Sequence, residues 1–324
     1  MKLGFLTART FLVLAAIAGL PHYAQAFDHV KTPGLGPGLE QTMRSVVSVL
    51  PEWADRPPSA EEPEGSGVVV ADGRLVLTAD HILGNPLSVR IRTSEGDIRA
   101  ARIFSRDSKT DLALLALDKP LPALRFDDEI AIGDQVCALG NAFGLGVSAT
   151  CGTVSAVKRS GTGFNTIEDF IQTDAAVNPG MSGGALIDRD GNLVGVLSAI
   201  FTKQSDANIG VNFAVSARLA QTALTRLRSR TDTFWPALDA RLRPHPPRGA
   251  TGRTGAAVVD ITPGSAAARS GLKPADVIIE ADGRRVRGPD DVVAAFALAA
   301  GEAGLTLSVL RSGEVVTIKV PIGQ

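Results

Sequence analysis

Residues 178–186 read Asn178-Pro179-Gly180-Met181-Ser182-Gly183-Gly184-Ala185-Leu186 and set a serine among glycines ahead of a short apolar run. A serine hydroxyl attacks a carbonyl only when a neighbouring base removes its proton, and backbone N–H groups must receive the oxyanion that forms. Glycines permit the backbone angles that turn such N–H groups toward one point. Ser182 is therefore a candidate nucleophile, and the N–H groups of Gly180 and Ser182 form a candidate oxyanion hole. Taken alone, the stretch is as typical of a surface turn before a strand as it is of a catalytic serine.

Two more residues have the chemistry that this serine needs. His81 closes the stretch Leu77-Thr78-Ala79-Asp80-His81, and histidine is the side chain best suited to exchange protons near neutral pH. Asp111 opens an apolar run, where a carboxylate can hold an imidazole in one tautomer. Each residue alone is more typical of an ordinary strand end. The chain order His81, Asp111, Ser182 is that of the chymotrypsin arrangement, so the three together predict a catalytic triad.

The rest of the central region indicates a β-rich fold. Short apolar runs separated by turn residues occupy residues 65–215 without intervening helical periods, which favours a sandwich or a pair of barrels. His81 and Asp111 fall in the first half and Ser182 in the second, so the triad would lie between two barrels. Residues 216–228 have helical spacing, with Leu219, Ala223 and Leu227 on one face. We assign residues 27–228 to this domain and its N-terminal arm.

The C-terminal part of the chain predicts a second, smaller domain. Residues 229–253 are basic and rich in proline and are expected to form a linker. Residues 254–324 alternate short strands with two helices, one of which has Ser265 as a candidate N-cap. The fold class is therefore mainly β, with a double barrel followed by a small α+β domain.

The first 26 residues resemble a secretory signal. Lys2 and Arg9 precede an apolar run at residues 11–20, and Ala24-Gln25-Ala26 provides small residues at a cleavage site. We expect cleavage after Ala26 and an exported mature chain. The alternative is an uncleaved membrane anchor, although the apolar run is about half the ~20 residues that a spanning helix needs.

Composition narrows the possible partners. The formal net charge of −1 argues against nucleic acid as a partner. Two cysteines and scattered histidines provide no plausible metal site, and no glycine-rich phosphate motif occurs, so no cofactor is expected. The cysteines, Cys137 and Cys151, flank the turn-rich segment 140–146. A hairpin centred on residue 144 would place them opposite one another in a disulfide. Two buried free thiols are the alternative, because a slip of one residue would turn them to opposite faces.

The sequence resembles the HtrA (Deg) family of trypsin-like serine proteases, and the matching motifs cover most of the mature chain. In the first half they are Gly65-Ser66-Gly67-Val68-Val69, Leu77-Thr78-Ala79-Asp80-His81 and Thr110-Asp111-Leu112-Ala113; in the second, Gly140-Asn141-Ala142-Phe143-Gly144-Leu145 and residues 173–180. The last domain resembles a PDZ domain through Pro263-Gly264-Ser265-Ala266-Ala267 and residues 271–278.

The resemblance implies a chymotrypsin-like double β-barrel followed by a PDZ domain. It also implies cleavage of unfolded or damaged proteins outside the cytoplasm, in the periplasm, without ATP. Assembly into a homo-oligomer, commonly a trimer, through residues 27–45 is a further implication.

Two departures from the family pattern stand out. Met181 occupies the position before the nucleophile, where the family usually has asparagine. The best match to the turn that captures a peptide C-terminus, Trp235-Pro236-Ala237-Leu238, lacks the usual glycine and includes a proline, which has no N–H to donate. The motifs therefore predict proteolysis more strongly than they predict C-terminal peptide binding.

The specificity pocket is expected to accept small or medium aliphatic side chains. Ala176 lies six residues before Ser182, where similar enzymes that cut after Lys or Arg have an aspartate. Leu197, Ser198 and Ala199 should line the same pocket. Two other functions remain open. One is a chaperone or binding scaffold with little proteolysis, and the other is a stress sensor that cuts one membrane partner.

Overall fold

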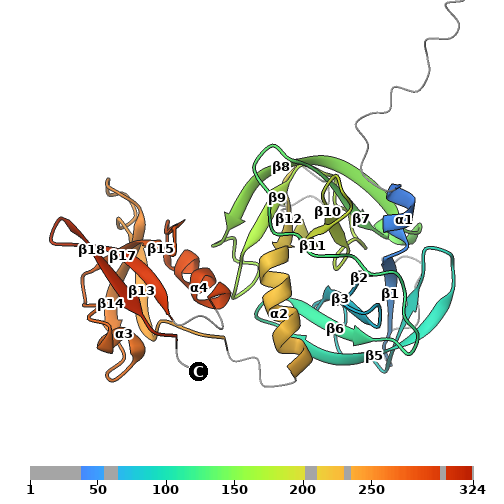
Figure 1. The fold of residues 1–324 in the computed structure, drawn as a ribbon, viewed down its shortest axis with the longest axis horizontal. Helices are drawn as coiled ribbons and strands as arrows, with labels where there is room; N and C mark the ends of the chain where they lie inside the picture. Colours follow the sequence, from blue (N-terminus) through green and yellow to red (C-terminus); the bar gives the residue numbers. More distant parts are fainter. Residues whose placement is uncertain (1–37, 55–64, 201–209, 230–234, 300–303, 323–324) are drawn as a thin grey trace, which may run out of the picture. The chain divides into compact units, whose positions relative to one another are not determined.

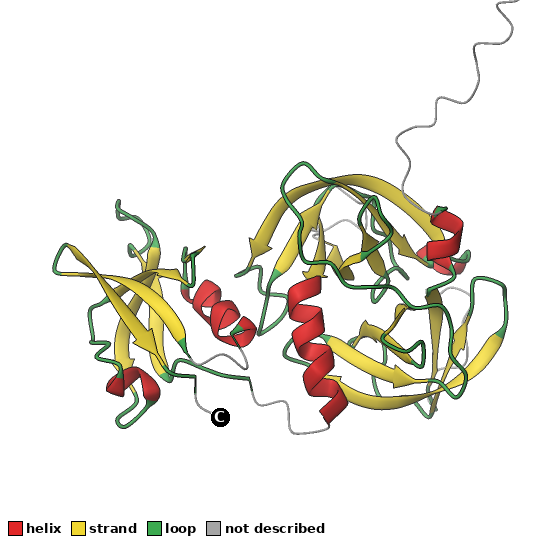
Figure 2. Ribbon diagram, in the orientation of Figure 1, coloured by secondary structure: helices red, strands yellow, loops and turns green. Residues whose placement is uncertain are grey.

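Residues 46–116 of the computed structural model form a closed barrel of six antiparallel strands, in the order β1-β2-β3-β6-β5-β4 (Figures 1 and 2). Alternate residues of a strand face opposite sides of a sheet, so Val47 and Val49 lie inside this barrel with Val69, Val76 and Leu115. A short helix, α1 (Leu39–Met43), precedes it. The strands are β1 (Val46–Glu52), β2 (Gly65–Val70), β3 (Leu75–Ala79), β4 (Ser88–Arg92), β5 (Ile98–Asp107) and β6 (Leu112–Ala116).

The structure describes residues 38–54, 65–200, 210–229, 235–299 and 304–322. For residues 199 and 200 it describes the backbone only. The predicted signal peptide, residues 1–26, lies outside these ranges. No helix within them is both long and apolar enough to cross a membrane.

A second closed barrel follows, in the order β10-β11-β12-β9-β8-β7. Its interior holds Val136, Ile171, Leu186, Val194 and Leu197. Together the two barrels confirm the predicted mainly β, chymotrypsin-like architecture. The strands are β7 (Gln135–Gly140), β8 (Ser148–Arg159), β9 (Phe170–Thr173), β10 (Ala185–Ile187), β11 (Leu193–Ile200) and β12 (Asn212–Ser216), with a short 3-10 helix, η2 (Ala142–Gly144), between β7 and β8.

The disulfide forms as the hairpin centred on residue 144 predicts. Cys137 of β7 pairs directly with Cys151 of β8, and their sulfur atoms are bonded. The bond therefore joins two neighbouring strands of the second barrel at the base of the hairpin that carries η2.

The two barrels and a helix share one apolar core. Leu77 and Leu114 of the first barrel and Leu139 and Val196 of the second belong to the same buried cluster. Helix α2 (Ala217–Ser229) packs against β5 and β6 of one barrel and β11 and β12 of the other (Figure 1). Its predicted apolar face, Leu219, Ala223 and Leu227, is buried in this cluster. Groups from the two barrels are thereby held at a fixed separation.

The C-terminal domain is a sheet in the order β13-β14-β15-β17-β18, with β16 paired to β15. Ser265 caps its first helix by accepting a hydrogen bond from the N–H of Ala268 at 3.2 Å. Residues 240–245, which fall in the expected linker, form β13 and pair along their whole length with β14. The elements are β13 (Ala240–His245), β14 (Gly255–Ile261), α3 (Ala266–Arg269), β15 (Val277–Ala281), β16 (Arg284–Arg285), α4 (Pro289–Leu298), β17 (Leu305–Arg311) and β18 (Glu314–Val320).

The connection between the domains is short. Trp235 is buried in the core shared by the barrels, and its indole N–H donates to Oδ2 of Asp107 at 2.8 Å. Leu238 is buried in the core of the C-terminal domain. Only Pro236 and Ala237 separate the two anchors. The indole of Trp235 is therefore buried in the core shared by the barrels, although Trp235 belongs to the stretch that most nearly matches a turn for capture of a peptide C-terminus.

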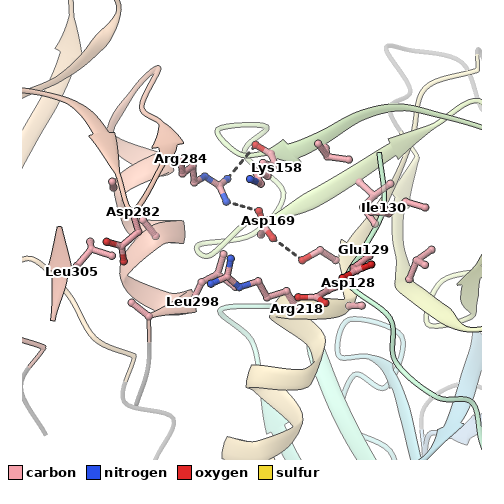
Figure 3. Close-up of a pocket in the computed structure, with 18 residues that line it drawn as sticks. Asp128, Glu129, Ile130, Lys158, Asp169, Arg218, Asp282, Arg284, Leu298 and Leu305 are labelled. Atoms are coloured by element: carbon pink, nitrogen blue, oxygen red, sulfur yellow. Dashed lines mark hydrogen bonds and ion pairs between the residues drawn. The ribbon is translucent and has the colours of Figure 1, made fainter. Parts of the chain in front are cut away.

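A cavity of about 320 Å³ lies where the C-terminal domain meets the second barrel (Figure 3). Beside it, Arg284 pairs with the carboxylate of Asp169 and donates to the carbonyl of Lys158 at 3.1 Å. Ser160 donates to Asp291 at 2.6 Å. None of the predicted catalytic or specificity residues lines this cavity.

Candidate active site

His81 and Asp111 meet at the rim of the first barrel. Asp111 precedes β6, and His81 lies two residues after the end of β3, which pairs with β6. Nδ1 of His81 lies 2.7 Å from Oδ2 of Asp111, and the main-chain N–H of His81 donates to Oδ1 at 2.9 Å. The Asp111 side chain is largely buried, whereas half of the His81 side chain is exposed. This arrangement fixes the ring through Nδ1 and leaves the other face of the imidazole accessible.

Asp111 raises the pKa of His81 above its ordinary value of 6.5. The hydrogen bond to the carboxylate is the largest cause, burial opposes it, and the charges of Asp111 and Asp80 add to it. Asp80 is itself paired with Arg106. The imidazolium is therefore favoured, as a base that must hold a proton transiently requires.

The turn that carries Asp111 is held from several sides. Asp111 has φ of +57°, a left-handed backbone that costs a non-glycine residue energy. The buried carboxylate of Asp107 accepts from Thr110 Oγ1 at 2.9 Å and from Trp235. The side-chain amide of Asn165 donates to the carbonyl of Thr110 at 3.1 Å. These contacts hold the turn in place and so stabilise the strained backbone at Asp111.

Ser182 follows a tight turn at the edge of the second barrel. The N–H of Met181 donates to the carbonyl of Asn178 at 3.0 Å, and Gly180 has φ of +93°, as the third position of a type II turn requires. Among the described hydrogen bonds, the N–H groups of Gly180 and Ser182 donate to no protein acceptor. Two unpaired donors beside one hydroxyl are what an oxyanion hole needs.

The hydroxyl of Ser182 donates to the carbonyl of Ser198 at 3.3 Å and, within the described residues, makes no hydrogen bond to His81. Ser198 itself donates from its side chain to Oδ2 of Asp111 at 3.3 Å. Sequence reasoning assigned Ser198 to the specificity pocket, whereas the structure links its two polar groups to Asp111 and Ser182. The structure thus brings all three predicted triad residues to the junction of the barrels.

The glycine after Ser182 cannot be replaced without a steric conflict. Gly183 has φ of +84°, and a Cβ there would lie 2.2 Å from the carbonyl oxygen of Ser66. The backbone of the first barrel therefore lies so close to the turn that carries Ser182 that no side chain fits between them.

Met181 is fully buried in the core of the second barrel. Its sulfur accepts a hydrogen bond from the N–H of Asn178 at 3.4 Å. The residue that departs from the family pattern thus lies in the core of the second barrel and stabilises the turn from inside the barrel.

The residues predicted for the specificity pocket fall into different surroundings. Ala176 is half-buried, and its carbonyl accepts a hydrogen bond from Thr150 Oγ1. Leu197 is buried in the core of the second barrel, because it alternates along β11 with Ser198, which faces Asp111. The side chain of Ala199 lies outside the described part of the structure. A metal site is not evident among the described residues, which contain no cluster of three or more metal-binding side chains.

Two known domain families match the chain. Residues 65–196 match the family described as a trypsin-like peptidase domain, and residues 207–322 match the PDZ domain.

Several characterised proteins are similar over most of the chain. The sequence is 30% identical to the periplasmic pH-dependent serine endoprotease DegQ of Escherichia coli (strain K12), over 99% of this chain and 76% of DegQ. It is 33% identical to the periplasmic serine endoprotease DegP of the same organism, over 80% of this chain and 57% of DegP. The chain thus spans little more than half the length of DegP. Among solved structures, the HtrA-type protease AlgW with a tripeptide matches with a TM-score of 0.69 and 30% identity, over 89% of this chain and 97% of AlgW.

Proposed function

Because the chain belongs to the HtrA family of trypsin-like serine proteases, we propose that it hydrolyses peptide bonds through a Ser182 acyl-enzyme. His81 acts as the base and then the acid, and Asp111 orients it. The observation that carries the proposal is the double hydrogen bond between His81 and Asp111 at the junction with the Ser182 turn.

Acylation begins when the Ser182 hydroxyl turns from the Ser198 carbonyl toward Nε2 of His81. As Oγ attacks the carbonyl carbon of the substrate, Nε2 takes the hydroxyl proton, and Asp111 stabilises the imidazolium. The carbonyl oxygen becomes an oxyanion that accepts from the N–H groups of Gly180 and Ser182. The imidazolium then donates its proton to the leaving amine as the C–N bond breaks.

Deacylation repeats these steps with water as the nucleophile. His81 removes a proton from the water as the water oxygen attacks the acyl carbon, and the second tetrahedral intermediate uses the same two N–H groups. His81 then returns the proton to Ser182 Oγ as the ester bond breaks and the carboxylic acid product leaves. The chain is a hydrolase that needs no group beyond these residues for the proposed reaction.

The preferred substrates are proposed to have small or medium aliphatic side chains before the scissile bond. Ala176 provides no carboxylate at the position that would attract Lys or Arg. Peptides that differ only in Val, Lys or Arg at that position test this idea. Faster cleavage after Val supports it, and equal rates would exclude an apolar pocket.

The protein is exported to the periplasm, in keeping with the DegQ and DegP relatives. We propose that it acts there on unfolded or damaged proteins. A homo-oligomer, commonly a trimer in this family, is proposed to form through residues 27–45, most of which lie outside the described ranges.

The test is labelling of the mature protein with a fluorophosphonate beside Ser182→Ala, with casein digestion followed in parallel. Labelling and digestion that both vanish in Ser182→Ala support the proposal. Labelling without digestion indicates a narrow substrate range and contradicts the proposed action on unfolded proteins. If no labelling occurs, even with denatured protein added, the protein is a binding scaffold instead.

A further inference from the structure

We propose that Ser66, a residue of the first barrel, is a positioning residue for the oxyanion hole of the second barrel. Its hydroxyl fixes the peptide plane that follows Gly180 and so helps to aim the Gly180 N–H at the oxyanion. This inference rests on the proposed function, because it assigns Ser66 a role in the same reaction.

The Ser66 hydroxyl is fully buried, and both of its described hydrogen bonds have short distances. It donates to the carbonyl of Gly180 at 2.7 Å and accepts from the main-chain N–H of Asn141 at 2.8 Å. A serine hydroxyl has a single hydrogen to donate. Because Asn141 provides a donor, the hydrogen of Ser66 is directed to Gly180, and rotation of the hydroxyl would remove this hydrogen bond from the buried carbonyl of Gly180.

Gly180 needs such support on both sides. Glycine has more backbone freedom than any other residue. The Gly180 N–H lies in the peptide plane before this residue, and the freedom of that plane is limited further when the plane after Gly180 is also held. The plane before Gly180 is held by Phe143, whose N–H donates to the carbonyl of Pro179 at 2.8 Å. In a trans peptide the C=O and the next N–H point in opposite directions, so this bond turns the Gly180 N–H away from Phe143. Ser66 holds the plane after Gly180.

Ser66 also forms a hydrogen bond with the backbone of Ser182. Its main-chain N–H donates to the carbonyl of Ser182 at 2.8 Å. One residue of β2 therefore holds the carbonyls of both residues whose N–H groups form the oxyanion hole. The spacing between these two N–H groups is set by the first barrel as well as by the turn itself.

Loss of the Ser66 hydroxyl should reduce stabilisation of the transition state more than it reduces substrate binding. The oxyanion exists only in the tetrahedral state, so misdirection of its donor lowers kcat and leaves KM nearly unchanged. Removal of an entire oxyanion donor costs about 10²–10³ in kcat. Ser66→Ala removes only the support of that donor, so we expect a loss of roughly 10- to 100-fold.

A matched control is available one strand away. Thr78 Oγ1 donates to the carbonyl of Ser66 itself at 2.6 Å and is equally buried. Thr78→Val, like Ser66→Ala, deletes one buried hydroxyl that bonds a backbone carbonyl, but it leaves the bond from Ser66 to Gly180 in place. A general loosening of this region should affect both variants alike.

The experiment compares the full mature chain, Ser66→Ala, Ser66→Cys, Thr78→Val and Ser182→Ala. Each protein is assayed for kcat and KM on a peptide with valine before the scissile bond, for inhibition by a peptide aldehyde, which binds as a tetrahedral adduct, and for thermal unfolding. Ser66→Cys keeps the size of the side chain and a weak donor, so it serves if Ser66→Ala fails to fold. The expected result is a fall in kcat in the order wild type, Ser66→Cys, Ser66→Ala, with a parallel rise in the aldehyde inhibition constant and with KM within about twofold.

Three results would overturn the inference: a Ser66→Ala kcat within about twofold of wild type, an equal loss of kcat in Thr78→Val, or a loss confined to KM. Each of them leaves the proposed function intact if the wild type is labelled by fluorophosphonate at Ser182. A wild type that neither labels nor cleaves, like Ser182→Ala, would instead remove the proposed function and this inference with it.

Discussion

The imidazole of His81 and the carboxylate of Asp111 are joined twice, by the ring nitrogen Nδ1 at 2.7 Å and by the main-chain N–H of His81 at 2.9 Å. The carboxylate thus sets both the charge preference of the ring and the position of the backbone that carries it. Its removal should change the pH dependence of catalysis as well as the rate.

Asp111→Asn should lower kcat by roughly 10⁴, because it favours the wrong tautomer of the imidazole. His81 works as a base only when it is neutral, so wild-type activity should rise with pH through a pKa above 6.5. Without the carboxylate, burial of the ring lowers that pKa, and the acid limb of kcat/KM should move to lower pH. A pH–rate profile of both proteins measures this shift; an unmoved limb would contradict the pairing.

The same raised pKa affects folding. The folded-state pKa of His81 lies above the ordinary 6.5, so the interaction stabilises the protein fully below that value and ceases to do so as pH rises through the folded-state pKa. The free energy of unfolding of wild type minus that of His81→Gln should therefore be larger at pH 5.5 than at pH 9, at about 25 °C. Urea denaturation at the two pH values provides the comparison.

Gly183→Ala should destabilise the protein more than Gly163→Ala. The two glycines have almost the same left-handed φ, +84° and +83°, but a Cβ at residue 183 would lie 2.2 Å from the carbonyl oxygen of Ser66, and a Cβ at residue 163 would meet nothing within 4 Å. Backbone strain alone costs about 1–2 kcal/mol. We expect Gly183→Ala to cost at least about 3 kcal/mol of unfolding free energy. Equal losses of unfolding free energy in the two variants would show that the structure accommodates a Cβ beside Ser66 without an energetic penalty.

Reduction of the disulfide should weaken the second barrel. The bond between Cys137 and Cys151 closes a loop with a sequence separation of 14 residues. A disulfide that closes a loop of this length typically adds about 3 kcal/mol to the free energy of unfolding. Urea unfolding with and without reductant measures the loss. The double variant Cys137→Ala, Cys151→Ala is the control, since reductant should leave its stability unchanged.

Trp235→Phe should destabilise the core that surrounds Asp107 by about 1.5–3 kcal/mol, because it removes an N–H donated to a buried carboxylate. The matched variant is Trp53→Phe, which removes an indole N–H donated at 2.9 Å to the neutral carbonyl of Leu83 in a part-buried position. Its loss should be smaller. A larger loss in Trp53→Phe, measured by thermal unfolding, would count against the role given to Asp107.

Local residue types explain why much of this site is predictable from the sequence. Acyl transfer requires the residue types of His81, Asp111 and Ser182 and favours glycines around the serine, and their order along the chain is that of the chymotrypsin arrangement. The bond between Cys137 and Cys151 follows from the symmetry of a hairpin about residue 144. Both patterns depend on neighbours in sequence or on one simple turn, and the structure contains the hydrogen bond between His81 and Asp111 and the register of the hairpin.

Long-range contacts explain what the sequence leaves hidden. Ser66 bonds Gly180, which is 114 residues away, and Asn141, which is 75 residues away; its motif, Gly65-Ser66-Gly67, is the only local signal. Ser198 reaches Asp111 across 87 residues. The strand β13 was hidden for another reason. Its exposed positions carry Arg241, Arg243 and Pro244, so its composition is typical of a linker, and only its pairing with β14 reveals a strand.

The division of the site between two barrels has a consequence for biosynthesis. A chain is made from its N-terminus, and domains fold as units during or after synthesis. His81 and Asp111 belong to the barrel that is complete at residue 116, whereas the barrel behind Ser182 closes only when β12, at Asn212–Ser216, pairs with β9 and β11. A nascent chain that ends before β12, or a fragment cut between the barrels, therefore contains His81 and Asp111 without an assembled active site.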